Sequence, residues 1–119
     1  MTLVDTSVWV DHFRRRNAGL ADLLDRGDVL GHLWIVGELA CGHLRRRREI
    51  LALLAALPQA RSVEEEEVLH FIETRRLFGK GIGWVDAHLL ASVALTGATL
   101  WTLDRALARA AAALRLSIR

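Results

Sequence analysis

The stretch from Gly81 to Leu107 constrains the fold most, because it reads as a helix, a strand and a second helix in succession. From Trp84 to Leu95 the apolar residues recur at helical spacing, and a glycine follows. Ala98 to Leu103 is then an apolar run with strand propensity. Asp86 therefore opens the predicted helix, and Asp104 closes the predicted strand. This pattern indicates an α/β fold, in which ligands gather at the carboxyl ends of parallel strands.

Composition limits the remaining possibilities. A length of 119 residues predicts one domain spanning residues 1–119, and 52% hydrophobic content with a single proline argues against disorder. No apolar run reaches the roughly 18 residues that a membrane span needs. Acidic residues interrupt the amino terminus early, so we expect no signal peptide, and a lone cysteine gives no reason to propose an oxidising compartment. We expect a cytoplasmic protein.

The rest of the chain continues the alternation of strands and helices. Strands are expected at residues 2–4, 29–31 and 59–62, with an edge strand in the final RLSIR. Helices are expected from Thr6 to Arg15 and then over residues 18–26, 45–57, 63–77 and 105–114. Between residues 34 and 44 the sequence WIVGELACGHL is apolar on almost every side.

Four acids stand out because each is flanked by apolar residues, at an element boundary or within a buried-looking run: Asp5, Glu38, Asp86 and Asp104. Each has an ordinary structural explanation. Asp104 is suited to cap the last helix, Asp86 to favour the positive end of its own helix, and Asp5 to cap the turn that follows it. An ionised Glu38 within an apolar run would be costly to bury without an ion-pair partner.

A joint explanation is stronger, because strand ends and helix starts converge on one edge of an α/β sheet. Two carboxylates about 4 Å apart repel by roughly 4 kcal/mol at an effective dielectric of about 20, so a cluster of them favours a bound cation. Oxygen-only ligands select a hard ion, Mg²⁺ or Mn²⁺. Such an ion can activate water and neutralise charge on a phosphoryl group, as in metal-dependent nucleases.

Four segments carry a family resemblance: MTLVDTSVWVDHF, GELACG, GIGWVDAHLLASV and ATLWTLD. In order and spacing they resemble the motifs of PIN-domain ribonucleases, specifically the VapC toxins of bacterial toxin–antitoxin pairs. The resemblance covers nearly the whole chain and implies a central parallel sheet flanked by helices. It assigns the four acidic motif positions to Asp5, Glu38, Asp86 and Asp104, with Thr6 and Thr102 as hydroxyl neighbours.

The resemblance also implies what the chain does. It implies endoribonuclease activity that depends on Mg²⁺ or Mn²⁺ and leaves a 5′-phosphate and a 3′-hydroxyl, with Asp5 and Asp86 as direct metal ligands. A VapB-type antitoxin and a homodimer follow from the same resemblance. Two alternatives stay open: a non-cleaving PIN-like module that binds RNA or protein, and a metal-dependent DNA nuclease.

Basic and aromatic residues supply candidate RNA contacts: Arg14, Arg15, Arg45, Arg46, Lys80 and Trp84. Arginines would neutralise phosphates without reading bases, although a solvated helix face explains them equally well. Core packing is favoured over base stacking for all four tryptophans, Trp9, Trp34, Trp84 and Trp101, and Trp84 is the one to test for RNA contact. None of the five histidines has a metal-site signature, and Cys41 and His43 lack partners for a zinc site.

Overall fold

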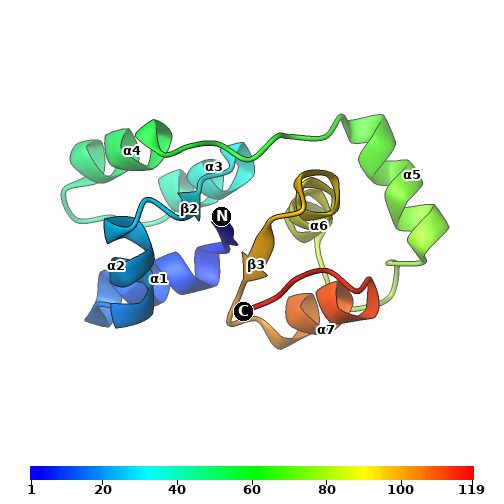
Figure 1. The fold of residues 1–119 in the computed structure, drawn as a ribbon. Helices are drawn as coiled ribbons and strands as arrows, with labels where there is room; N and C mark the ends of the chain where they lie inside the picture. The colour runs from blue at the N-terminus through cyan, green and yellow to red at the C-terminus, as the bar shows by residue number, and fades with distance from the viewer.

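A computed structural model describes all residues from Met1 to Arg119, and Figure 1 shows its elements. In chain order they are β1 (Thr2–Val4), α1 (Thr6–Arg15), α2 (Ala18–Asp25), β2 (Val29–Leu30), α3 (Leu33–Cys41), α4 (Arg47–Ala56), α5 (Glu65–Arg75), α6 (Trp84–Thr96), β3 (Thr99–Trp101) and α7 (Arg105–Ala113). The predicted α/β class is confirmed. No helix in the structure combines the length and apolarity that crossing a membrane requires.

The sheet has three parallel strands in the order β2-β1-β3. Thr2 pairs with Val29 on one side and with Thr99 on the other, so β1 is the central strand. The predicted strand at residues 59–62 and the predicted C-terminal strand are each reduced to one bridge, Gly31 with Gln59 and Leu100 with Ile118. These bridges extend the parallel arrangement outward at both edges.

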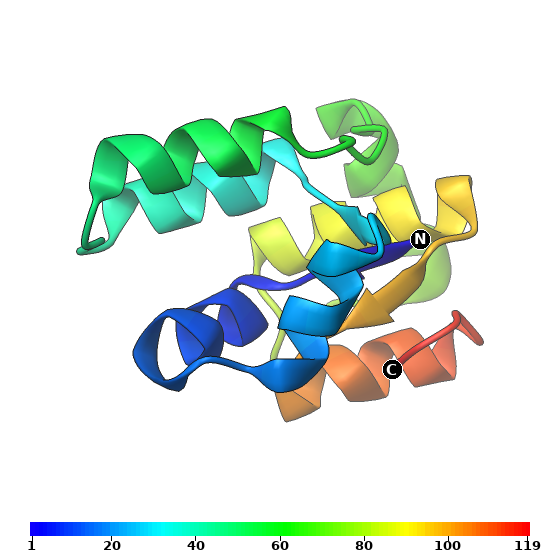
Figure 2. The same cartoon turned by 60° about the vertical axis from the view of Figure 1, so that its left-hand side comes forward.

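The helices cover both faces of the sheet. In Figure 1, α1 to α4 lie toward the β2 edge of the sheet and α5 to α7 toward the β3 edge. Right-handed crossovers place α1 and α2, which connect β1 to β2, on one face of the sheet, and α6, which leads back to β3, on the opposite face. In the turned view of Figure 2 the strands lie between α6 and α7. The chain leaves β1 toward one edge of the sheet and leaves β3 on the other side of β1, so the carboxyl ends of β1 and β3 are neighbours at the point where the strand order reverses.

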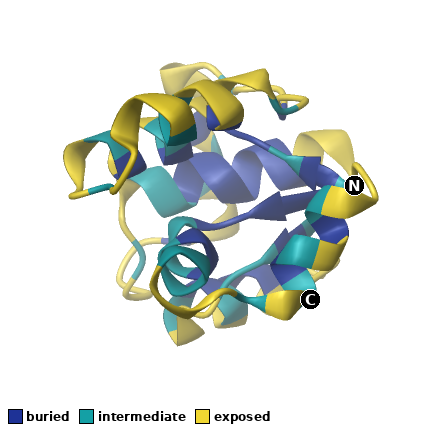
Figure 3. Cartoon of the chain, turned by 90° about the vertical axis from the view of Figure 1, so that its left-hand side faces the viewer, coloured by how far each residue is buried: buried dark blue, intermediate teal, exposed yellow.

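The core lies between the sheet and these helices. Leu3 of β1, Leu100 of β3 and Leu89 of α6 are fully buried, and each contributes roughly 1.5–3 kcal/mol through burial. Figure 3 shows burial concentrated on the strands and the middle of α6, while α4 is largely exposed. The α6 helix has a long run of buried residues and ends at Gly97, a glycine in the αL conformation. It is therefore a rigid support for Asp86 in its first turn.

One buried histidine joins α3 to α6. The His32 side chain caps α3 by accepting a hydrogen bond from the Trp34 backbone N–H, with 3.1 Å between Nδ1 and N. Because Nδ1 accepts, the neutral ring carries its proton on Nε2, which donates to Ser92 Oγ at 2.9 Å. Burial lowers the pKa of His32 to about 4. The link therefore stays intact at neutral pH and holds the helix of Glu38 against the helix of Asp86.

Candidate active site

Asp5 lies at the carboxyl end of β1 and is only 6% exposed. It occupies the N-cap position of α1, yet its side chain makes no capping hydrogen bond, so the capping explanation for this residue is wrong. Its Oδ2 atom instead accepts hydrogen bonds from the hydroxyls of Ser7 and Thr102, both at 2.7 Å. Two donated hydroxyls stabilise an ionised carboxylate and fix its orientation.

Thr102 connects Asp5 to Asp104. Its Oγ1 donates to Asp5 and accepts from the Asp104 backbone N–H at 3.0 Å. Ser7 Oγ adds a bond from the Leu103 N–H at 3.0 Å. The loop after β3 is thereby tied to the end of β1 by side chains about a hundred positions apart in the sequence. Of the two hydroxyl neighbours expected beside the acids, Thr102 touches Asp5.

Asp104 does not end a strand directly, because β3 stops at Trp101 and two loop residues follow. The prediction of a strand end was therefore wrong by a few residues. The Thr102 side chain makes a local turn by bonding the Asp104 N–H, which ends the ladder. Asp104 Oδ1 caps α7 by accepting from Ala106 N and Leu107 N. The predicted role of Asp104 as a helix cap is therefore confirmed for Oδ1, whereas Oδ2 has no protein hydrogen-bond donor.

Asp86 is half-buried in the first turn of α6, where Oδ2 accepts from the Gly83 N–H at 3.1 Å. This contact belongs to a helix-capping arrangement, so the structural explanation again accounts for one oxygen. Burial raises the pKa of Asp86, the Gly83 hydrogen bond opposes that rise, and the charges of Asp5, Asp104 and Glu38 raise the pKa further. The other three acids therefore lie close enough to affect the ionisation of Asp86.

Glu38 is exposed, so the expectation of a costly buried charge was wrong. The α3 helix packs against α1, α4 and α6 through buried residues such as Ile35 and Leu39, and Glu38 lies on the exposed side of the helix beside Gly37. The predicted neighbour Thr6 donates from Oγ1 to Glu38 Oε1 at 2.7 Å, and no cation pairs with Glu38. An acid at this position, joined to the start of α1, faces the same edge as Asp5.

The electrostatics of this edge favour a cation. All three salt bridges of the protein lie elsewhere, between Asp11 and Arg15, Asp22 and Arg26, and Arg46 and Glu49. The four acids thus repel one another without a compensating positive side chain. No three of them lie close enough to enclose one ion by themselves. Mg²⁺ suits such a site, because it takes one or two carboxylates and keeps several waters.

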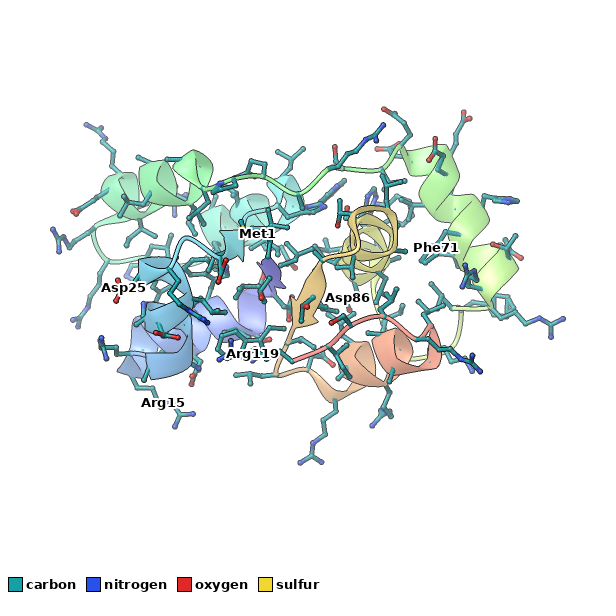
Figure 4. All side chains as sticks on the ribbon, in the orientation of Figure 1. Met1, Arg15, Asp25, Phe71, Asp86 and Arg119 are labelled. Carbon is teal, nitrogen blue, oxygen red and sulfur yellow. The ribbon has the colours of Figure 1, made fainter.

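The basic residues predicted to contact RNA divide into two groups. Arg14, Arg45 and Arg46 line a groove of about 760 Å³ that also includes Thr6 and Glu38. Lys80 lines a second groove of about 400 Å³ between α5 and α7. Arg15 points outward in Figure 4 and pairs with Asp11 at 2.6 Å.

The aromatic residues are less uniform than expected. Trp9 is buried as predicted, whereas Trp84 is 38% exposed and contacts the His88 ring edge-on at 4.4 Å between centroids. Trp34 packs on the same ring at 4.6 Å. His88 is buried with neither ring nitrogen hydrogen-bonded, and burial lowers its pKa. It is a structural residue, as expected of the histidines.

Sequence reasoning missed Ser7 as a member of the site. A serine two positions after an aspartate at a strand end is a typical helix cap, and Ser7 was assigned only that role. Its hydroxyl points back to Asp5 and forward to the loop of Thr102. The one available signal was the hydroxyl-rich sequence directly after Asp5.

The Thr102→Val variant tests the bridge between Asp5 and Asp104. It keeps the shape and removes the hydroxyl. For the metal-dependent endoribonuclease activity that the resemblance implies, we expect RNA cleavage to fall by about 10–100-fold, as for other residues that orient metal ligands. The expected loss shrinks as the concentration of Mg²⁺ rises. Thr74→Val is the matched control, because the Thr74 hydroxyl bonds only carbonyls of its own helix. Equal activity of the two variants in a cleavage assay would contradict the bridge.

Comparison with known proteins identifies the family. A family model described as PIN domain matches residues 2–113. Ribonuclease VapC32 of Mycobacterium tuberculosis, in strain H37Rv and in strain CDC 1551 / Oshkosh, is 48% identical over 113 residues, which cover 94% of this chain and 91% of that protein. The chain belongs to the PIN-domain family, among its VapC ribonucleases. The predicted resemblance is confirmed.

Proposed function

We propose that the acidic edge of the sheet is where this endoribonuclease hydrolyses RNA, with divalent ions held by Asp5, Glu38, Asp86 and Asp104. One observation carries the proposal: Asp86 ionises in the field of three other carboxylates, and none of the four acids has a cationic partner. A folded protein gains nothing structural from this repulsion. A site that binds Mg²⁺ or Mn²⁺ gains a ready set of hard oxygen ligands.

The four acids have different roles in this proposal. Asp5 and Asp86 are the direct ligands, because Asp5 is rigidly oriented and Asp86 is the acid whose pKa the charges of the other three raise. Glu38 and Asp104 complete the negative field and orient water for in-line attack on phosphorus. When bound, a divalent ion lowers the pKa of water and neutralises charge on the phosphate. The products carry a 5′-phosphate and a 3′-hydroxyl.

The family also supports partners for the protein. We propose that it is the toxin of a type II toxin–antitoxin pair, working in the cytoplasm, and that a VapB-type antitoxin blocks the acidic edge. The free toxin forms a homodimer in this proposal. Co-purification from the native operon and the solution mass of the free toxin test these two assignments separately.

The test of function is incubation of the pure protein with mixed RNA and mixed DNA. We expect cleavage of RNA with Mg²⁺ or Mn²⁺, none with a chelator, and recovery when metal is restored, because four unpaired carboxylates need a cation to approach a phosphate. Gel electrophoresis of the RNA and the DNA measures cleavage with metal, with the chelator and after metal is restored. The mechanism is wrong if RNA is cut fully in chelator. Cleavage of DNA alone would identify a DNA nuclease, and binding without cleavage would identify a non-cleaving module.

A further inference from the structure

A groove on the α5–α7 side of the sheet is lined by four cations and no acid. Arg75, Arg76, Lys80 and Arg109 line it together with apolar residues, and its volume is about 400 Å³. None of the four takes part in a salt bridge. Like charges gathered without counter-ions repel one another, and a polyanion in the groove would relieve this repulsion.

The groove begins at the acidic edge. Ala106 lines the groove, and its backbone N–H also donates to Asp104 Oδ1 at 2.9 Å. On the opposite wall, the loop from α5 leaves the groove after Lys80 and reaches Gly83, whose N–H donates to Asp86 Oδ2. Figure 1 shows this loop descending from α5 beside α7. Both walls therefore lead from the groove to a carboxylate of the proposed site.

The shape of the groove suits a phosphate backbone. Ala106, Ala110 and Ala113 form a smooth floor along α7, which extends roughly 13 Å from the acidic edge at about 1.5 Å per residue. A Cβ at Gly81 would lie 3.6 Å from Ala106, so the loop packs closely against this helix. The Arg75 guanidinium lies over the Phe71 ring at 5.7 Å, which holds it in place.

We propose that this groove, named here the α7 groove, binds phosphates of the RNA strand on one side of the bond to be cut. The groove of Arg14, Arg45 and Arg46 borders Glu38 toward α1, α3 and α4, away from α7, and takes the strand beyond the cut. The proposal rests on the proposed function and extends it with a binding site of its own. Because phosphate contacts carry no sequence information, the α7 groove contributes affinity to every RNA alike.

The test removes three charges from the groove: Arg75→Gln, Lys80→Gln and Arg109→Gln together. The triple variant also carries Asp5→Asn, so that RNA is bound without being cut. A matched control carries Arg26→Gln, Arg48→Gln and Arg61→Gln, which change net charge equally and line neither groove. Binding of a mixed-sequence single-stranded RNA is measured by fluorescence anisotropy over a range of salt, and thermal unfolding checks that both triple variants fold.

We expect the groove variant to bind RNA on the order of tenfold more weakly. The slope of log K against log salt concentration should also be shallower by about 2, because each of three phosphate contacts to a single strand contributes about 0.7 to that slope. The control should bind as the parent does. Equal binding by the groove variant and the control would overturn the proposal. So would unchanged RNA binding with lost antitoxin binding, which would mark the groove as a protein interface.

Failure of this proposal is distinct from failure of the proposed function. If the protein with Asp5 intact cleaves RNA in Mg²⁺ and the groove variant binds RNA as tightly as the control, only the α7 groove is wrong. If the protein with Asp5 intact cuts no RNA, the function itself is wrong. With Asp5 intact, the groove variant should also need more RNA to reach half-maximal cleavage, while the rate at saturating RNA changes little.

Discussion

The Asp5→Asn variant is expected to fold normally and to cut RNA on the order of a thousandfold more slowly, because a neutral amide stabilises neither a divalent ion nor the charge that develops on the phosphate. Asn retains an oxygen that accepts the hydroxyls of Ser7 and Thr102, so the local hydrogen bonds survive. Cleavage of a labelled RNA in Mg²⁺ measures the loss, and circular dichroism with thermal unfolding verifies the fold.

Asp28→Asn is a suitable control, since it neutralises another half-buried aspartate, directly before β2 and outside the acidic edge. Its activity should match that of the parent. An Asp5→Asn variant that retains metal-dependent cleavage at the parent rate would show that β1 does not carry the active carboxylate.

The Asp86→Asn variant should lose cleavage to a similar extent, on the order of a thousandfold, and should gain stability when no metal is present. In the folded protein the pKa of Asp86 is raised, first by burial and then by the other three acids, so the ionised group costs folding free energy. Asparagine removes that charge and still accepts the Gly83 N–H. We expect the metal-free Tm at neutral pH to rise by about 3 °C.

The direction of the pH effect follows from the same linkage. Above its raised folded pKa, Asp86 carries the full penalty of ionisation, and the penalty disappears as pH falls through that pKa toward the unfolded value of 3.8. The Tm difference between the parent and Asp86→Asn should therefore shrink on acidification. Mg²⁺ should raise the Tm of the parent more than that of the variant. A variant less stable than the metal-free parent at neutral pH would contradict the proposed repulsion.

Local sequence patterns predicted the order of elements well, because helices and strands here follow their own periodicity. The α6 helix and Asp86 at its start were located from apolar spacing and the glycine that ends the run. Strand lengths were predicted less well. Residues 59–62 and the last five residues form single bridges, since an edge strand depends on the neighbour it finds and not on its own composition.

The four acids of the candidate site were singled out from the sequence, whereas the hydrogen bonds that connect them to their neighbours were not predicted. Ser7, Thr102 and Asp5 are joined by hydrogen bonds that cross almost the whole chain, and no local pattern reports such contacts. Glu38 was expected to be buried because its neighbours are apolar, yet the packing of α3 on α4 leaves it exposed. The α7 groove could not be predicted either, because Arg75 of α5 and Arg109 of α7 line one groove only in the folded chain.

The hydroxyl pair on Asp5 has a consequence for the ion that the site accepts. Both hydroxyls bond Oδ2, which leaves Oδ1 as the one oxygen of this carboxylate without a protein donor. For the metal site proposed above, Asp5 would therefore offer an ion one oxygen, whereas calcium sites often use both oxygens of a carboxylate. The two hydroxyls would in this way favour magnesium over calcium without themselves holding the ion.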